Sequence, residues 1–115
     1  MINDNPKFNV IYLSQAQKYL YLLDDKTRSK IFENIDLARF TLDPGLLKKL
    51  TGEIWEFRTL FNGVKYRLLA FWDKRDSTNT LVVATHGFIK KESKVPKMEI
   101  NKALEIRRKY FNDNK

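Results

Sequence analysis

Two arginines, Arg58 and Arg67, stand at equal distances on either side of an Asn62-Gly63 pair. Asn-Gly between two runs of alternating apolar residues predicts a β-hairpin with a two-residue type I′ turn. Such a hairpin places Arg58 directly opposite Arg67 on one face of the sheet. Like charges held opposite each other are unfavourable, so we expect either a bound anion or screening by Glu56, which lies diagonal to Arg67. Guanidinium forks match phosphate oxygens, so the first interpretation is a phosphate-binding site and the second is a solvated, ion-paired sheet face.

The two faces of this hairpin differ in composition. Alternation assigns one face to Trp55, Phe57, Phe61, Val64, Tyr66, Leu68, Ala70 and Trp72, and the arginine face to Ile54, Glu56, Leu60, Lys65, Leu69 and Phe71. The first set is almost wholly apolar and is expected to form the core. The arginine face is therefore expected to be open, at least in part.

The chain contains one histidine, His86, near the end of a further predicted strand. An unperturbed pKa of about 6.5 suits proton transfer near neutral pH, so His86 is a candidate general acid or base, although a lone histidine is more often structural. The loop that follows carries Lys90, Lys91 and Lys94, which are phosphate contacts or simply a solvated surface. Phe88 either stacks on a base or packs. The other basic candidates for nucleic-acid contacts are Lys65 and, before the hairpin, Lys48 and Lys49.

The composition limits the remaining possibilities. Among 115 residues there are 22 Lys and Arg, 14 Asp and Glu, and no cysteine, so the net charge is +8 and thiolate chemistry is excluded. Such a charge favours a polyanion or an acidic partner. No metal-ligand spacing surrounds the histidine and no Gly-rich phosphate loop is present, so neither a metal nor a cofactor is expected. The absence of a membrane-length apolar run and of a signal-peptide pattern predicts a cytoplasmic protein.

The elements that must position these residues follow from periodicity and end signals. We expect one domain over residues 1–115, with strands over 8–13, 53–61, 64–72 and 81–88, helices over 14–23 and 25–42, and a last helix from Pro96. Residues 46–50 are ambiguous between a helical turn and a loop. The order β-α-α-β-β-β-α predicts an α+β domain with a mostly antiparallel sheet.

Two helix starts are predicted from local signals. Ser14 and Gln17 have the spacing of a capping box, and Asp24 is expected to cap the second helix. Residues at helical spacing should line the inner faces: Ala16, Tyr19, Leu20 and Leu23 in the first helix, and Ile31, Ile35, Ala38 and Leu42 in the second.

Several short motifs together resemble a known family. They are Trp55-Glu56-Phe57-Arg58, Tyr66-Arg67, His86-Gly87-Phe88, Lys90-Lys91, Pro96, Glu99, Ile100 and Ala103. Their order and spacing resemble the phage-type HigB branch of the RelE/ParE toxin superfamily over about residues 8–111. The resemblance implies a toxin of a type II toxin–antitoxin pair, folded as a helical hairpin on a twisted antiparallel sheet in which the first strand joins the later hairpin.

The resemblance also implies metal-independent cleavage of mRNA in the ribosomal A site, by attack of the RNA 2′-hydroxyl on the adjacent phosphate. Arg58 and Arg67 would then hold the scissile phosphate, and Lys90 and Lys91 would grip flanking phosphates, assist charge stabilisation or supply a base. His86 would be the general acid or base. Glu56 would be the complementary base or would orient Arg67. No catalytic tyrosine of the kind found in RelE-type relatives follows the last strand, and Tyr110 is the nearest in sequence.

Two other functions remain open at this point. A ParE-like protein would inhibit DNA gyrase by binding, and a non-enzymatic RNA-binding or ribosome-associated module would grip phosphate without cleaving it. The expected partners are mRNA, the ribosome and a cognate antitoxin, a HigA-like helix-turn-helix protein.

Overall fold

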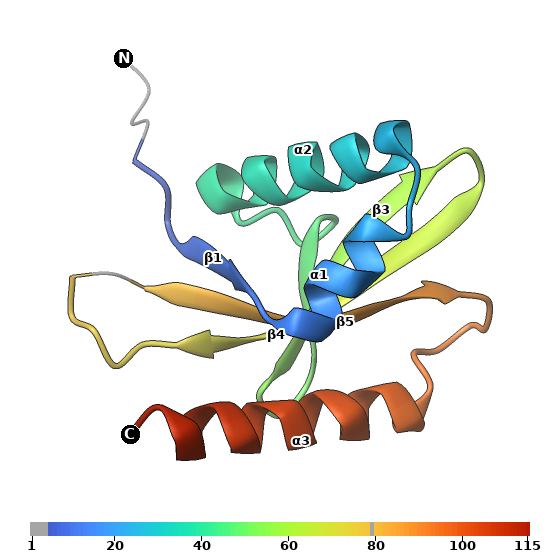
Figure 1. The fold of residues 1–115 in the computed structure, drawn as a ribbon. Helices are drawn as coiled ribbons and strands as arrows, with labels where there is room; N and C mark the ends of the chain where they lie inside the picture. The colour runs from blue at the N-terminus through green and yellow to red at the C-terminus, as the bar shows by residue number, and fades with distance from the viewer. Residues whose placement is uncertain (1–4, 79) are drawn as a thin grey trace.

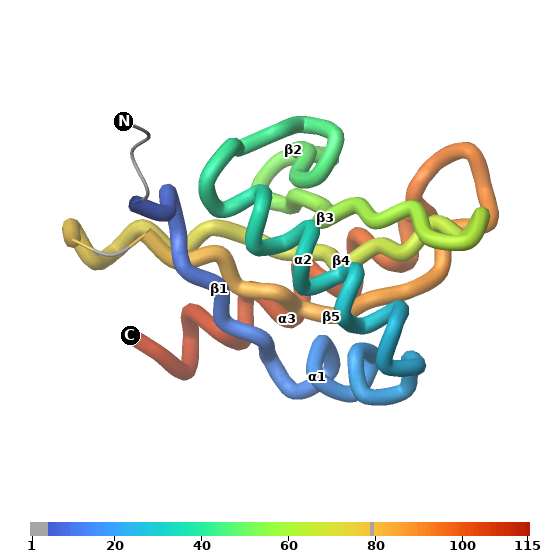
Figure 2. Tube along the Cα trace, turned by 90° about the horizontal axis from the view of Figure 1, so that it is seen from above, coloured from blue at the N-terminus to red at the C-terminus, as the bar shows by residue number. Residues whose placement is uncertain are grey.

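A five-stranded sheet separates two layers of helix in the computed structural model, which describes residues 5–78 and 80–115 (Figure 1). Helices α1 and α2 cover one face and α3 covers part of the other. Seen from above, α2 lies across the middle of the sheet (Figure 2). The elements are β1 (Asn9–Tyr12), α1 (Ser14–Tyr21), α2 (Asp25–Thr41), β2 (Leu47–Thr51), β3 (Ile54–Phe61), β4 (Val64–Asp73), β5 (Leu81–Lys90) and α3 (Lys97–Asp113).

The strand order is β1-β5-β4-β3-β2, with β1 parallel to β5 and the other pairs antiparallel. The predicted α+β class and element order are confirmed, with one strand added. Residues 47–51 form edge strand β2, where Leu47 is buried and Lys48 and Lys49 are exposed. The first strand pairs with β5, the last strand, and makes no ladder with the β3–β4 hairpin.

The main core lies between the sheet and the α1–α2 hairpin. Ala16, Leu20, Ile31, Ile35 and Ala38 meet Phe57, Leu68, Ala70, Val82 and Ala84, all nearly inaccessible. Trp72 lies edge-on to Phe8 and Trp55, at centroid separations of 5.3 and 5.6 Å. The core face predicted from alternation is thereby confirmed.

The helix ends follow the predictions in part. Asp24 caps α2, because its Oδ1 accepts a 2.8 Å hydrogen bond from the Thr27 amide. The capping box at Ser14 is wrong: Ser14 already lies inside α1, and the side-chain amide of Gln17 donates from Nε2 to Tyr12 O instead. Leu42 is also not a core residue, because it ends α2 in the left-handed region (φ 55°) and is 43% exposed.

Helix α3 covers the apolar half of the arginine face. Ile54, Leu69 and Phe71 are completely buried in a second core cluster with Val83 and Ala103. The arginine face is therefore open only in part, as the weaker form of the expectation allows, because its apolar residues need a cover of their own.

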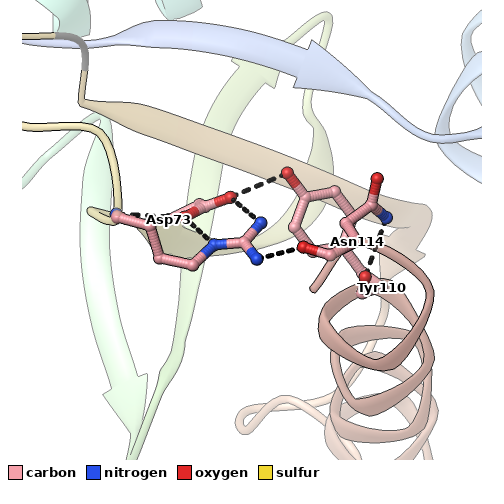
Figure 3. Close-up of polar contacts among 4 residues, drawn as sticks. Asp73, Tyr110 and Asn114 are labelled. Carbon is pink, nitrogen blue, oxygen red and sulfur yellow. Dashed lines mark hydrogen bonds and ion pairs between the residues drawn. The ribbon is translucent and has the colours of Figure 1, made fainter.

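The C-terminal end of α3 is fastened by a polar cluster around Asp73 (Figure 3). The Asp73 carboxylate accepts from Arg75 Nε and Nη2 at 2.9 and 2.8 Å, and from the Tyr110 hydroxyl at 2.8 Å. Arg75 also donates to Asn114 O. The Arg75 hydrogen bonds, together with that of Tyr110, hold the pKa of Asp73 well below its usual range. Tyr110 is thus a structural residue at the far end of β4 from the arginines.

Candidate active site

Strand register brings charged side chains from four strands onto the half of the sheet that α3 leaves uncovered. Cross-strand partners form three rows on this face: Lys48, Glu56, Leu69 and His86; then Arg58, Arg67 and Phe88; then Leu60, Lys65 and Lys90. We call its five cations, Lys48, Arg58, Lys65, Arg67 and Lys90, the cationic face. The first row is the boundary between this face and the apolar half of the sheet face on which α3 packs.

The predicted hairpin turn sets this register. Asn62 and Gly63 both have positive φ, 51° and 77°, as a type I′ turn requires at its two central positions. Phe61 then pairs with Val64, and Arg58 with Arg67. The pairing of the two arginines predicted from the Asn-Gly signal is confirmed.

Glu56 screens the two arginines unequally. Its Oε1 lies 3.0 Å from Arg67 Nε, and both side chains are 5% exposed. The alignment is that of an ion pair rather than a hydrogen bond, and Arg67 Nη1 donates instead to Tyr66 O at 3.1 Å. Arg58 is 33% exposed, and its Nε lies 3.9 Å from Glu56 Oε2. The ion-paired interpretation therefore holds for Arg67, which Glu56 binds closely. Arg58 is left mostly uncompensated, and phosphate binding by the pair stays a prediction.

The surplus of positive charge contributes to a lowered pKa at Lys90. Partial burial lowers the pKa of the Lys90 ammonium, and Arg67, Lys65 and Arg58 lower it further, while Glu56 opposes them. One carboxylate thus faces five cations across neighbouring strands. An anion bound here would gain from all of them, and the same repulsion makes the Lys90 ammonium easier to deprotonate.

His86 is placed differently from what the sequence predicted. The ring is 2% exposed, with Nδ1 3.0 Å from Thr85 Oγ1 and Nε2 3.0 Å from Glu99 Oε1. Burial lowers the pKa of His86, while its contact with Glu99 opposes this shift. The Thr85 hydroxyl donates to Leu69 O at 3.2 Å, so its oxygen also faces His86 Nδ1. Both ring nitrogens thus have a polar neighbour, and His86 joins β5 to the first turn of α3. Its role as a general acid or base stays a prediction.

The remaining predicted contacts divide by strand and face. Lys91 and Lys94 are exposed in the segment between β5 and α3, at the same end of the molecule as the β3–β4 turn (Figures 1 and 2). Phe88 is half-buried opposite Arg67 and packs on the second core cluster. Lys49 is opposite Trp55 and so belongs to the other face. Residues 47–51 form a strand instead of the helical turn or loop expected over residues 46–50.

Comparison with known proteins identifies the family. Residues 18–108 match the family described as phage-derived protein Gp49-like (DUF891). The chain belongs to the Gp49-like family. The fold of this Gp49-like protein is similar to a chain in the crystal structure of the toxin–antitoxin complex RelBE2 from Mycobacterium tuberculosis. The two are 21% identical with a TM-score of 0.56, and the alignment covers 80% of this chain and 100% of that one.

The RelE-type fold implied by the sequence resemblance is therefore confirmed, and the family shown is the phage-derived Gp49-like one. None of the curated proteins compared with the Gp49-like chain matches it significantly. Within residues 5–78 and 80–115, no helix is long and apolar enough to cross a membrane, and no group of three or more His, Asp or Glu side chains could hold a metal ion.

Sequence reasoning missed one support of the Gp49-like site, the packing of Tyr19 on Gly87. A Cβ atom at position 87 would lie 2.2 Å from Tyr19 Cδ2, far inside contact distance. The Tyr19 hydroxyl also donates to Phe88 O at 3.3 Å. The glycine in His86-Gly87-Phe88 is thus the signal: it lets α1 approach the strand that carries Phe88 and Lys90.

Proposed function

We propose that this protein is the toxin of a toxin–antitoxin pair and that it cleaves mRNA, during translation, at the cationic face. The observation that carries the proposal is the surplus of guanidinium and ammonium groups around one buried carboxylate, on a sheet face left open beside α3. The Gp49-like family and the RelE-type fold support the same conclusion.

In the proposed reaction the RNA supplies its own nucleophile. The 2′-oxygen forms a bond to the adjacent phosphorus while the bond from phosphorus to the 5′-oxygen breaks, leaving a cyclic phosphate and a 5′-hydroxyl. A base must take the 2′-hydroxyl proton, an acid must protonate the leaving oxygen, and cations must stabilise the charge on the phosphorane. No nucleophile is required from the protein.

The geometry suggests a division of these tasks. Arg67 is held by Glu56 and Tyr66 O, so its guanidinium is preorganised and needs no rearrangement when charge develops on the phosphate. Arg58 is exposed enough to bind the same phosphate directly. Lys90, whose pKa is lowered, is the side chain best suited to act as the base. Glu56 is then a positioning residue for Arg67.

Other side chains would hold the RNA on either side. Lys65 and Lys48 extend the cationic face along the sheet, and Lys91 and Lys94 would contact phosphates beyond the end of β5. His86 supports the site by attaching α3 at its boundary.

The proposal is tested by inducible expression in a bacterium, followed by primer extension on an abundant mRNA. The wild type should arrest growth and produce new 5′ ends inside translated regions. Arg58→Ala and Arg67→Ala should lose both effects, since removal of a preorganised donor typically costs about 10²–10³ in rate. Lys49→Ala, on the other face, is the matched control and should behave as the wild type.

Two outcomes would contradict the nuclease proposal. Growth arrest without new 5′ ends would indicate inhibition by binding, as in a gyrase inhibitor. No arrest by a well-expressed wild type would favour a module that binds RNA without cleaving it.

We also propose that a cognate antitoxin, expected to be a helix-turn-helix protein encoded beside the toxin, binds and neutralises the protein. The structurally similar RelBE2 chain comes from a toxin–antitoxin complex, which supports this expectation. Co-expression with the adjacent reading frame should restore growth and yield a complex that copurifies. Continued growth arrest with both proteins expressed would refute the pairing.

A further inference from the structure

A groove of about 430 Å³ runs beside β3, between the sheet and the N-terminal half of α2. Lys30 and Asn34 of α2 form one wall, and Leu46 closes the end next to β2. Arg58, Lys65 and Arg67 of the cationic face form the other wall. The groove therefore opens directly from the candidate active site.

The charge of this groove distinguishes it from other hollows of the described surface. Four cations line it, and none of its lining residues is acidic. A hollow of about 650 Å³ between β1 and α2 is lined by Glu33 and Asp36 as well as by Arg39, and another beside α3 includes Asp113. Glu33 lies 3.7 Å from Lys30 Nζ, and Glu56 lies 3.0 Å from Arg67 and 3.9 Å from Arg58, so two carboxylates face four cations. An anionic occupant would offset the positive charge that remains.

Two donors in the groove, Arg58 Nε and Arg67 Nε, make no hydrogen bond within the described part of the chain, and Arg67 Nε has the closer carboxylate, Glu56, at 3.0 Å. The Nε atom of Arg58 is buried and makes no hydrogen bond with any described residue, and the nearest carboxylate oxygen, Glu56 Oε2, is 3.9 Å away. A buried donor of this kind costs free energy unless a ligand or water satisfies it. This points to an occupant that offers oxygen acceptors.

The remaining walls suit a nucleotide better than a free anion. Asn34 donates to Thr59 Oγ1 at 3.2 Å, which holds an amide in the wall, and Leu46 adds an apolar side chain next to it. An amide can hydrogen-bond to the edge of an unstacked base, and a guanidinium plane such as that of Arg58 can stack on its face. Lys30 and Lys65 supply charge for phosphates. The volume is also within the range of small-molecule sites.

We propose that this groove binds the nucleotide adjacent to the scissile phosphate of single-stranded RNA, with Lys30 on the flanking phosphate. The inference rests on the proposed function, because it takes the substrate to be RNA. With this groove, α2 becomes part of a binding site that otherwise consists of strands. The RNA would run from the cationic face past β3 to α2.

The test is equilibrium binding of a labelled uridine oligonucleotide whose 2′-fluoro sugars prevent 2′-hydroxyl attack. Loss of one phosphate contact lowers the salt slope of log K by about 0.7, which corresponds to about fivefold weaker binding at about 0.1 M salt. Lys30→Ala should show both changes, and Lys30→Arg should restore them. Lys26→Ala, an exposed lysine on the same helix outside the groove, should bind as the wild type does.

The outcomes separate this inference from the nuclease proposal. If Lys30→Ala binds with unchanged affinity and salt slope while the wild type cleaves 2′-hydroxyl RNA, the groove inference alone is overturned. If binding depends on Lys30 but no RNA is cleaved, the groove is supported and the nuclease proposal fails. If the wild type binds no RNA at all, both are overturned. Thermal unfolding of each variant confirms that the folded protein is being compared.

Discussion

Replacing Glu56 by glutamine should destabilise the protein strongly. Replacing Arg58, which lies farther from the same carboxylate and is partly exposed, should not. Glu56 and Arg67 are each 5% exposed, with 3.0 Å between Oε1 and Nε. At an effective dielectric constant of about 20 this attraction is worth about 5.5 kcal/mol, much of it offset by desolvation of the two charges. Removing one partner leaves the other charge buried, which typically costs about 3–5 kcal/mol. Glutamine retains an acceptor, so we expect a loss of about 3 kcal/mol.

Arg58 provides the matched comparison. Its Nε lies 3.9 Å from the same carboxylate and its side chain is 33% exposed, so Arg58→Gln should cost less than about 1 kcal/mol. Urea unfolding should therefore show a midpoint for Glu56→Gln lowered by about 1–3 M, given typical m-values, and a midpoint for Arg58→Gln close to that of the wild type.

The same two variants should respond oppositely in RNA binding. Glu56→Gln removes the carboxylate from the cationic face, so the folded variant should bind the 2′-fluoro oligonucleotide more tightly, while Arg58→Gln should bind it less tightly. If Glu56→Gln costs under about 1 kcal/mol, or if both variants unfold at the same urea concentration, the assignment of a buried Glu56–Arg67 pair is wrong.

Three further predictions follow from the supports of the site. Gly87→Ala should cost about 1–3 kcal/mol by overpacking against Tyr19, and urea titrations should show little cost in a Tyr19→Ala background; an equal cost in both backgrounds would refute the contact. Asp73, whose pKa is lowered in the folded state, stabilises the protein above the unfolded pKa of about 4 and loses this effect as the pH falls. The stability gap between wild type and Asp73→Asn should therefore shrink below about pH 4, and a gap unchanged between pH 6 and pH 3 would contradict this. His86→Gln should lower the melting temperature through loss of the Glu99 contact, yet leave the single-turnover cleavage rate within a few-fold of wild type; a large loss of rate with unchanged melting would show that His86 takes part in proton transfer.

The division of one sheet face into an apolar and a charged half explains how so small a protein can both fold and present a site. The apolar half provides a seat for α3, whose C-terminal end is fastened through Asp73 and whose first turn is fastened through His86. Because α3 ends its cover at the Glu56 row, the next rows of the sheet remain available to an anion.

The sequence by itself determined the features that depend on residues close together in the chain. The Asn62-Gly63 turn alone sets a two-residue hairpin, and with it the pairing of Arg58 with Arg67 and the diagonal position of Glu56, because side chains alternate along a strand with a strict period of two. The Asp24 cap and the apolar helix faces are predictable for the same reason, since each depends on residues within one or two turns of each other.

Contacts between distant segments decided the rest. The Nε2 contact of His86 is with Glu99, thirteen residues further on. The short run at Lys48-Lys49 becomes a strand because β3 offers an edge to pair with. Alternation also does not reveal which half of a mixed face a helix will cover. The groove beside β3 lies between α2 and a hairpin more than twenty residues away in the chain. A sequence pattern within one helix or hairpin does not predict that these two elements pack side by side. Such contacts depend on how layers of secondary structure pack in three dimensions, and that arrangement exists only in the folded chain.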